Sequence, residues 1–288
     1  MISSSNNPGL RTLAALIQIE FEDLYLKWGQ SQPPRTGLHA SSLLVSDQEW
    51  CTRKHVLAEI FSDEVRNPEL ARWQWKQQAV FENGWDVHKR WQKMFAKFGK
   101  VVWTPISDEQ ASDITYSIPP ALFKYYLKLV GSQWFAAELD LTHYDETRQV
   151  YFSPDIISEF AGEQYPVEIK GINHDSFQSL TSNLDQARKA CETVDKAVIQ
   201  ANLYLHLLQL DHTIILIEDK NNQEFKVWIV EYDRSMALPY VQRAYHVKGG
   251  LVHAKHGRYP DRVCQTIDDP LARKCPMREC CFSEKMER

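Results

Sequence analysis

Two short stretches hold the residues whose types and spacing could do chemistry: a Pro-Asp step ending at Asp155, and the run Val-Glu-Ile-Lys ending at Lys170. In a β-strand, side chains two residues apart share a face, so Glu168 and Lys170 should project together while Val167 and Ile169 pack into the interior. If the neighbouring strand brings Asp155 alongside, two carboxylates can hold a hard divalent cation, and the ammonium group can face a phosphate or an attacking water. A charged pair on the exposed face of an edge strand would have the same pattern, and that alternative stays open.

Two helical runs carry further polar groups. Residues 197 to 205 form a predicted helix in which Gln200 and Tyr204 stand four apart, on one face. Another predicted helix, at about 70 to 98, contains Gly84 and His88; the glycine permits close approach and the histidine supplies a nitrogen ligand. Taken alone, His88 has the alternative of a satisfied core or surface histidine, and Gln200 and Tyr204 have the alternative of ordinary packing.

The order of these elements, His88, then Pro-Asp155, then Glu168-x-Lys170, then Gln200-x-x-x-Tyr204, resembles the RecB-like branch of the PD-(D/E)xK nuclease superfamily, over roughly residues 40 to 288. The resemblance implies that His88, Asp155, Glu168 and the carbonyl of Ile169 bind Mg²⁺ or Mn²⁺. It implies that Lys170 orients the nucleophilic water, and that Gln200 and Tyr204 steady the metal site or the DNA backbone. A histidine ligand suits Mn²⁺ better than Mg²⁺.

The six cysteines form a second group of candidate ligands. Cys51 stands early, Cys191 stands alone, and Cys264, Cys275, Cys280 and Cys281 crowd the end of the chain. The polar first residues have neither a basic start nor an apolar block, so we expect no secretory leader and a cytoplasmic location. In that compartment clustered thiols are more often metal or cluster ligands than disulfides. Cys191, without a nearby ligand partner, is predicted to be structural.

This arrangement of cysteines is similar to that of RecB-like nucleases in which an iron-sulfur cluster joins the two ends of the nuclease region. CRISPR-associated exonucleases and AddB-type nucleases are among them. The resemblance implies a 4Fe-4S cluster on Cys51, Cys264, Cys275 and Cys281. The chain departs from the usual pattern because ten residues separate Cys264 from Cys275, where a C-x2-C pair is common before the last cysteine. Cys280 could replace Cys281, and Zn²⁺ held by four thiolates is the alternative.

The composition limits the classes of protein to which this chain can belong. The chain has 288 residues, of which 43% are hydrophobic, enough for a large core, and contains no apolar run long enough to cross a membrane. Its net charge of −5 argues against a nucleic-acid substrate, since a phosphate binder should present basic surface. The charge is unevenly distributed, however: residues 243 to 288 hold ten Lys or Arg against six Asp or Glu.

We predict an α/β protein with a restriction-endonuclease-like core, in which a mixed central sheet is flanked by helices. The expected divisions are a helical region at 1–50, a nuclease core at 51–255 with a possible insertion at 104–133, and a cysteine-rich tail at 256–288 that is stapled to the early region. Three strands at about 134–144, 150–160 and 165–171 should form an antiparallel meander, and the step from there to a strand at 213–219 should be a crossover. Within the insertion we expect a helix at about 122–130.

The predicted function is metal-dependent DNA exonuclease activity at DNA ends or in single strands. A protein partner in recombination, repair or CRISPR adaptation is compatible with it. Two other classes stay open: a non-catalytic DNA-binding or assembly protein on a nuclease scaffold, and a zinc-stabilised interaction module whose Asp155, Glu168 and Lys170 are surface charges. The sequence leaves the digestion polarity, the preference for single or double strands and the oligomeric state undecided.

Overall fold

The structure is a computed structural model that describes residues 16–17, 19–20, 37–61, 75–117, 125–138 and 142–283. The chain divides into two compact units. The larger unit comprises residues 37–56 and 84–261, and the smaller unit comprises residues 1–36, 57–83 and 262–288. The predicted divisions at 50, 255 and 104–133 stay predictions.

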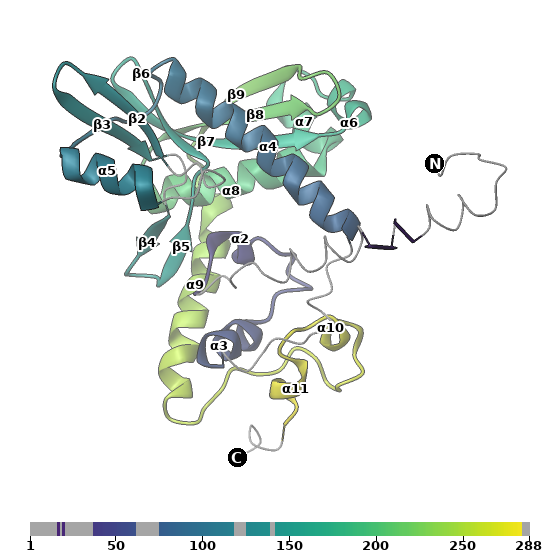
Figure 1. Ribbon diagram of the computed structural model, residues 1–288. Helices are drawn as coiled ribbons and strands as arrows, with labels where there is room; N and C mark the ends of the chain where they lie inside the picture. The colour runs from purple at the N-terminus through teal and green to yellow at the C-terminus, as the bar shows by residue number, and fades with distance from the viewer. Residues whose placement is uncertain are drawn as a thin grey trace. The chain divides into compact units, whose positions relative to one another are not determined.

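A four-stranded sheet forms the centre of the larger unit (Figure 1). Its strands are, in spatial order, β6 (Ile156–Phe160), β7 (Glu163–Ile172), β8 (His212–Asp219) and β9 (Phe225–Glu231). The outer pairs β6–β7 and β8–β9 are antiparallel, whereas β7 and β8 are parallel. The predicted class, a mixed central sheet flanked by helices, is therefore confirmed, and so is the crossover into β8.

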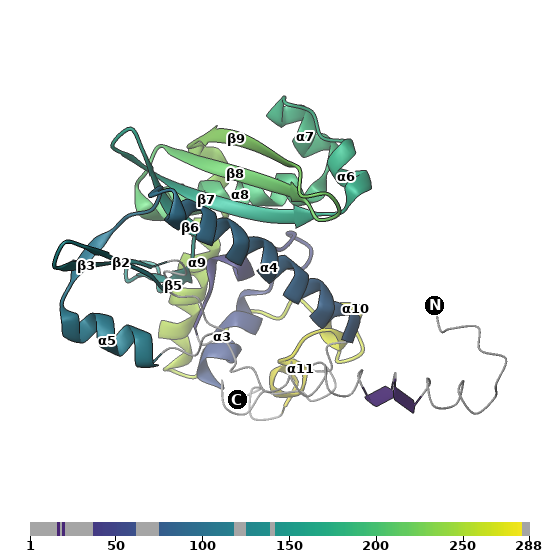
Figure 2. The same cartoon turned by 45° about the horizontal axis from the view of Figure 1, so that its top comes forward.

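Helices cover both faces of this sheet, as Figure 2 shows. On one face, α4 (Trp75–Lys97) packs its apolar side chains against β6, β7 and β8. On the other face lie α6 (His174–Gln178), α7 (Leu184–Ala190) and α8 (Glu192–Leu208). The helix α9 (Arg234–Ala254) packs against α8 in a neighbouring apolar cluster. Asn173, Asn183 and Asp233 begin α6, α7 and α9, each accepting a hydrogen bond from a backbone N–H of the first turn.

The connection between β6 and β7 fixes the register on which the candidate site depends. Ala161 and Gly162 both have positive φ, at 54° and 85°, which is the conformation of a two-residue hairpin turn whose twist matches that of the strands. Counting back from this turn, Ile156 pairs with Val167 as the last rung of the hairpin. The residues just before β6 therefore lie beside the middle of β7.

Two smaller sheets precede the central one, and here the structure corrects two predictions. β1 (Thr104–Ile106), β3 (Gln133–Glu138) and β2 (Tyr125–Val130) form an antiparallel sheet in that order, and α5 (Asp108–Ser117) stands between β1 and β2 in the chain. The helix expected at 122–130 is wrong, because residues 125–130 pair with β3 along their whole length.

The predicted three-strand meander is also wrong. The expected first and second strands each divide in two, and β4 (His143–Asp145) with β5 (Val150–Phe152) makes a separate two-stranded sheet. The second break falls at Ser153-Pro154-Asp155, where proline has no N–H to give to a ladder. The break frees Asp155 from strand pairing and leaves its side chain available.

The remaining described elements are short, apart from α3. They are α2 (Ala40–Leu43) and α3 (Thr52–Ile60) in the first part of the chain, and α10 (Pro270–Arg273) and α11 (Arg278–Cys281) in its last part. Most of the helical region predicted at 1–50 lies outside the described residues. Among the described residues, no helix combines the length and apolar character that crossing a membrane would need.

An ionic and hydrogen-bonded contact fastens α4 to the sheet. The carboxylate of Glu218, at the end of β8 and almost fully buried, pairs with Arg90 and accepts a hydrogen bond of 2.6 Å from the indole N–H of Trp91. Both donors come from α4. Because the same helix carries His88, this contact sets the distance between that imidazole and the sheet.

We therefore expect Glu218→Gln to lower the free energy of unfolding by about 2 kcal/mol, since the amide keeps one acceptor but presents an N–H₂ group to a guanidinium or an indole donor. Urea unfolding measures the difference. Glu159→Gln, at an exposed position of β6, is the matched control and should change the free energy by less than about 0.5 kcal/mol. Equal stability of the two variants would show that Glu218 does not hold α4 in place.

Candidate active site

The side chains of β7 alternate as predicted, but both faces of the strand are covered. Val167 and Ile169 are buried in the cluster that includes α4, which confirms that they pack into the interior. Glu168 points to the opposite face and is only 1% exposed, because α8 packs there. A carboxylate with so little water contact must have a partner, a proton or a cation to be stable.

Asp155 directly precedes β6, so it lies beyond the last residue pair of the hairpin. Its side chain, rather than a strand backbone, accepts the hydrogen bond of β7 at this point. Its Oδ2 accepts a hydrogen bond of 2.7 Å from the backbone N–H of Ile169, and its own carbonyl accepts one of 2.9 Å from the Gln92 side chain of α4. Its Oδ1 lies 3.1 Å from Nδ1 of His88, also on α4. The carboxylate is thus held from both sides, with 15% of its side chain exposed.

Lys170 and Glu168 form an ion pair on the α8 side of β7. The ammonium group contacts Oε1 of Glu168, and about a quarter of the lysine side chain is exposed. Oε2 of Glu168 is buried and has no hydrogen-bond partner among the described residues. A buried, unpartnered carboxylate oxygen is costly, and it is the feature that a bound cation would satisfy.

Burial and neighbouring charges set the protonation states of Glu168, Asp155 and His88. Burial, with a contribution from Asp155, raises the pKa of Glu168 to about 7 although Lys170 opposes the shift. Burial also acts against the charged form of Asp155, yet His88 and Lys170 together with the Ile169 N–H hold its pKa below the usual range. Burial would lower the pKa of His88, but Asp155 outweighs it and raises that pKa. The site therefore favours an ionised Asp155 beside a charged imidazole and places Glu168 near the point of titration.

Gln200 and Tyr204 lie on α8, and Gln200 donates a hydrogen bond of 2.8 Å to the hydroxyl of Tyr204. The Tyr204 hydroxyl also accepts from the backbone N–H of Ser153, next to the Pro-Asp step. Burial and the nearby charges of Glu168 and Asp155 raise the pKa of Tyr204, so the phenol keeps its proton. This pair supports the segment that carries Asp155 and gives α8 a polar contact with the site.

The structure thus brings the predicted residues of the larger unit together in three contacts: His88 with Asp155, Glu168 with Lys170, and Gln200 with Tyr204. Between them, Asp155 is tied to the backbone of Ile169. Among the described residues, no group of three or more His, Cys, Asp or Glu side chains is already arranged to hold a metal ion. The roles of these residues are therefore taken up below as a proposal.

The predicted cluster ligands divide between the two units. Cys51 belongs to the larger unit and is half-buried, whereas Cys264, Cys275 and Cys281 belong to the smaller one and are half-buried as well, as is Cys280. Within the smaller unit, the described cysteines do not form a group of three that could hold a metal. Cys191 is buried in the apolar cluster of α7 and α8, as expected for a structural thiol.

Sequence reasoning missed the contact of Arg90 and Trp91 with Glu218. The ring of Trp91 packs against the apolar core, while its N–H donates to Glu218. A usable signal was present, because Glu218 directly follows the unbroken apolar run of residues 214 to 217. An acid that continues such a run is placed on a buried strand and requires a partner.

The shifted pKa of Glu168 has a measurable effect on the metal-free protein. In the unfolded chain this carboxyl titrates at about 4.3, so between that pH and about 7 the folded state binds the proton more tightly. The stabilisation is complete below the lower value and is lost as the pH rises through the higher one. The free energy of unfolding should therefore fall with rising pH across this window, by on the order of 3 to 4 kcal/mol.

Urea unfolding in chelator at a series of pH values measures this slope. Other groups also titrate in the window, so the informative quantity is the difference between the wild type and Glu168→Gln, which carries a permanently neutral side chain of the same shape. The variant should gain stability over the wild type as the pH rises. Parallel curves for the two proteins would mean that Glu168 keeps an ordinary pKa.

Comparison with known proteins gives weak similarities only. No protein-family model matches the sequence, and no curated protein sequence is significantly similar to it. Several solved structures resemble the chain. Three of them are the protein SSO0001 (13% identity, 81% of this chain and 86% of that one, TM-score 0.39), a phage-related exonuclease from Haemophilus somnus 129PT (10%, 77% and 96%, 0.38) and an alkaline exonuclease from Laribacter hongkongensis (9%, 75% and 96%, 0.33). Similarities of this size do not assign the chain to a family.

Proposed function

We propose that this protein is a divalent-metal-dependent deoxyribonuclease that hydrolyses phosphodiester bonds at DNA ends or in single strands. The observation that carries the proposal is the buried, unpartnered Oε2 of Glu168, next to the ion pair with Lys170 and on the strand whose backbone binds Asp155. The large majority of buried side-chain polar atoms in proteins have a hydrogen-bond partner. One left unsatisfied, beside a lysine and a second carboxylate, fits a site that works with a cation.

The donor set suits Mg²⁺ or Mn²⁺. Glu168 and Asp155 offer carboxylate oxygens, and His88 offers a nitrogen, which favours Mn²⁺; the carbonyl of Ile169 is the proposed fourth donor. Asp155 is engaged by His88, and Oε1 of Glu168 by Lys170. These contacts compensate the charges of the two carboxylates.

The bound ion would supply an activated water and polarise the phosphate oxygens. The chain's own residues do the rest. Lys170, held at the site by Glu168, would donate hydrogen bonds to the attacking water and to the charge that develops on the phosphate. Gln200 and Tyr204 would keep the Asp155 segment in place through the hydroxyl contact with Ser153.

Cleavage of end-labelled single-stranded and duplex oligonucleotides with Mn²⁺, Mg²⁺ or chelator tests the proposal. We expect products with either metal, more with Mn²⁺, and none in chelator. The label position gives the digestion polarity. DNA that is bound but left intact with Mn²⁺ would contradict nuclease activity and favour a non-catalytic DNA-binding protein.

We propose separately that Cys51, Cys264, Cys275 and Cys281 bind a 4Fe-4S cluster, with Cys280 in place of Cys281 and four-thiolate Zn²⁺ as the alternatives. What supports this is the resemblance in cysteine layout and the partial burial of these thiols. Anaerobic purification should give a brown protein with visible charge-transfer absorption. Stoichiometric zinc without iron would refute the cluster. A protein partner in recombination, repair or CRISPR adaptation is proposed on the same resemblance.

A further inference from the structure

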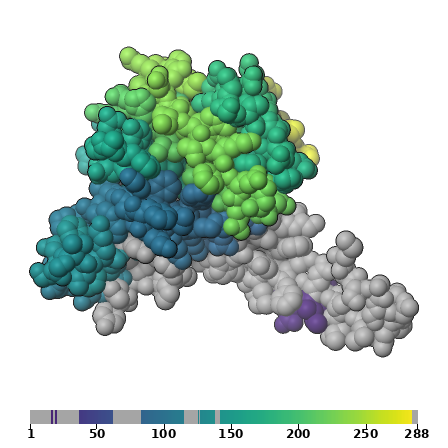
Figure 3. All heavy atoms as spheres, turned by 90° about the horizontal axis from the view of Figure 1, so that it is seen from above, coloured from purple at the N-terminus to yellow at the C-terminus, as the bar shows by residue number. Residues whose placement is uncertain are grey.

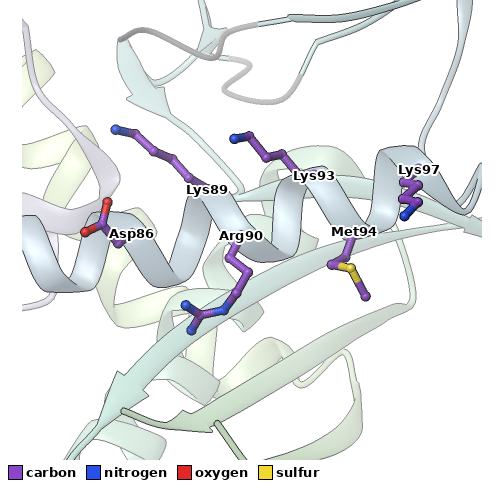
Figure 4. Close-up of a pocket in the computed structure, with 6 residues that line it drawn as sticks. All are labelled: Asp86, Lys89, Arg90, Lys93, Met94 and Lys97. Atoms are coloured by element: carbon purple, nitrogen blue, oxygen red, sulfur yellow. The ribbon is translucent and has the colours of Figure 1, made fainter. Parts of the chain in front are cut away.

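One face of α4 is strongly basic in a chain whose net charge is −5. A shallow hollow of about 500 Å³ lies along this face, and it is lined by Asp86, Lys89, Arg90, Lys93, Met94 and Lys97. Four of these six residues are cationic and one is anionic. Figure 4 shows Lys89 and Lys93 projecting from the same side of the helix, with Arg90 directed away from them toward the sheet. We call Lys89, Lys93 and Lys97 the lysine stripe.

The packing of α4 against the sheet does not use the stripe. Arg90 has a structural role, because it pairs with the buried Glu218. The apolar contact of α4 with the sheet is made by other positions, among them Val87 and Trp91. Figure 3 shows the blue segment of the chain, which includes α4, at the surface as a band beside green residues from later in the chain. The lysine stripe adds nothing to that packing and gathers positive charge at one place.

The stripe is fixed in position relative to the candidate metal site. His88 stands directly before Lys89 on the helix, and its imidazole contacts Asp155. Gln92 stands directly before Lys93, and its amide binds the carbonyl of Asp155. Two successive turns of α4 therefore each offer one residue to the site and the next residue to the stripe.

We infer that the lysine stripe binds the sugar-phosphate backbone of the DNA strand that enters the site. The inference rests on the proposed function, and it identifies the surface by which the substrate is held. Residues four apart on a helix are separated by about 6 Å along its axis, so the three lysines leave the helix at regular intervals. Flexible lysine stems can follow phosphates repeating along one strand, whereas a row so narrow offers little area for a folded acidic protein.

An aromatic ring stands at one end of the stripe. Nζ of Lys89 lies 4.2 Å from the ring centre of Trp85, whose side chain is 43% exposed. An exposed tryptophan beside a phosphate-binding lysine offers a surface on which an unpaired base can stack. This arrangement favours a single-stranded segment over a duplex at that end of α4.

The test is DNA binding without cleavage, measured by fluorescence anisotropy in chelator, for single-stranded and duplex oligonucleotides over a range of salt concentrations. The variant replaces the stripe: Lys89→Gln, Lys93→Gln and Lys97→Gln together. Its matched control replaces three exposed lysines elsewhere, Lys189→Gln, Lys196→Gln and Lys255→Gln, so that the net charges of the two variants are equal. Circular dichroism and Mn²⁺ binding verify that both fold and keep the site.

The stripe variant should bind single-stranded DNA at least about tenfold more weakly near 0.1 M salt, with a log-log salt slope smaller by about 2, while the control binds like the wild type. Equal losses in the two variants, or none in either, would overturn the inference. Binding of the wild type to anionic vesicles but not to DNA would overturn it too, in favour of a membrane surface.

The two proposals fail in different ways. A wild type that cleaves DNA while the stripe variant binds it normally would overturn only the stripe. A wild type that binds DNA through the stripe yet never cleaves it would overturn only the nuclease activity.

Discussion

Lys170→Met is expected to lower the rate of DNA cleavage by on the order of 10³-fold, the loss typical of removing one donor to a developing negative charge. The ammonium group is positioned by Glu168 and partly withdrawn from water, so its charge is not replaced by solvent when it is lost. Methionine keeps most of the side-chain volume. Single-turnover cleavage with saturating Mn²⁺ measures the chemical step directly.

Folding of this variant is expected to persist, although Glu168 loses its partner. The pKa of Glu168 is already raised to about 7, so the carboxyl can take up a proton instead of remaining as an unpaired buried charge. Lys189→Met, at an exposed position of α7, is the matched control and should cleave like the wild type. A folded Lys170→Met protein with near wild-type rates would remove Lys170 from the mechanism.

Asp155→Asn is expected to weaken Mn²⁺ binding by at least about 100-fold. Removing a group that only supports a metal ligand lowers metal affinity by up to about 100-fold, and removing a direct ligand should cost at least as much. The amide oxygen can still accept the hydrogen bond from Ile169, so the loop geometry should survive while the charge beside His88 disappears. Calorimetric titration with Mn²⁺ gives the affinity, and cleavage should fall with it.

The control for this variant is Asp185→Asn, in the exposed first turn of α7. It removes one carboxylate of the same kind at a distance from the site and should leave the affinity unchanged. Unaltered Mn²⁺ binding by Asp155→Asn would mean that the ion, if it binds at all, uses other ligands.

Strand alternation and helical spacing correctly predicted which neighbouring side chains of the site share a face. Strand alternation placed Val167 and Ile169 in the interior, and helical spacing placed Gln200 next to Tyr204. The burial of Glu168 was not predictable in this way, because it depends on α8 covering the second face of β7. A strand covered on both faces shows no alternation of burial, and its polar residues are then the unusual ones.

Contacts between distant parts of the chain could be predicted only through the resemblance. Nothing within residues 84 to 97 indicates that His88 meets Asp155, since the approach depends on the docking of α4 through Glu218. The helix expected at 122–130 failed for a related reason. Its leucines fit a helical pattern, but the pairing of Tyr125–Val130 with β3 satisfies the backbone and overrides local preference.

Pro154 indicates a break in the chain that the prediction of one continuous strand at 150–160 did not include. Pro154 lies in the middle of an apparently continuous strand pattern from 150 to 160, and the chain there leaves one sheet and enters another. A proline in such a pattern argues against a single strand. The result is functional as well as structural, because Asp155 can bind the Ile169 N–H only from an unpaired position.

The central claim is that His88, Asp155, Glu168 and the Ile169 carbonyl surround one divalent cation. Anomalous scattering from crystals grown with Mn²⁺ tests it most directly, because the peak locates the ion without reference to activity. The account predicts a single strong peak within about 2.5 Å of Oε2 of Glu168 and of a carboxylate oxygen of Asp155. A saturated crystal with its Mn²⁺ peaks elsewhere, and Glu168 still paired only with Lys170, would contradict it.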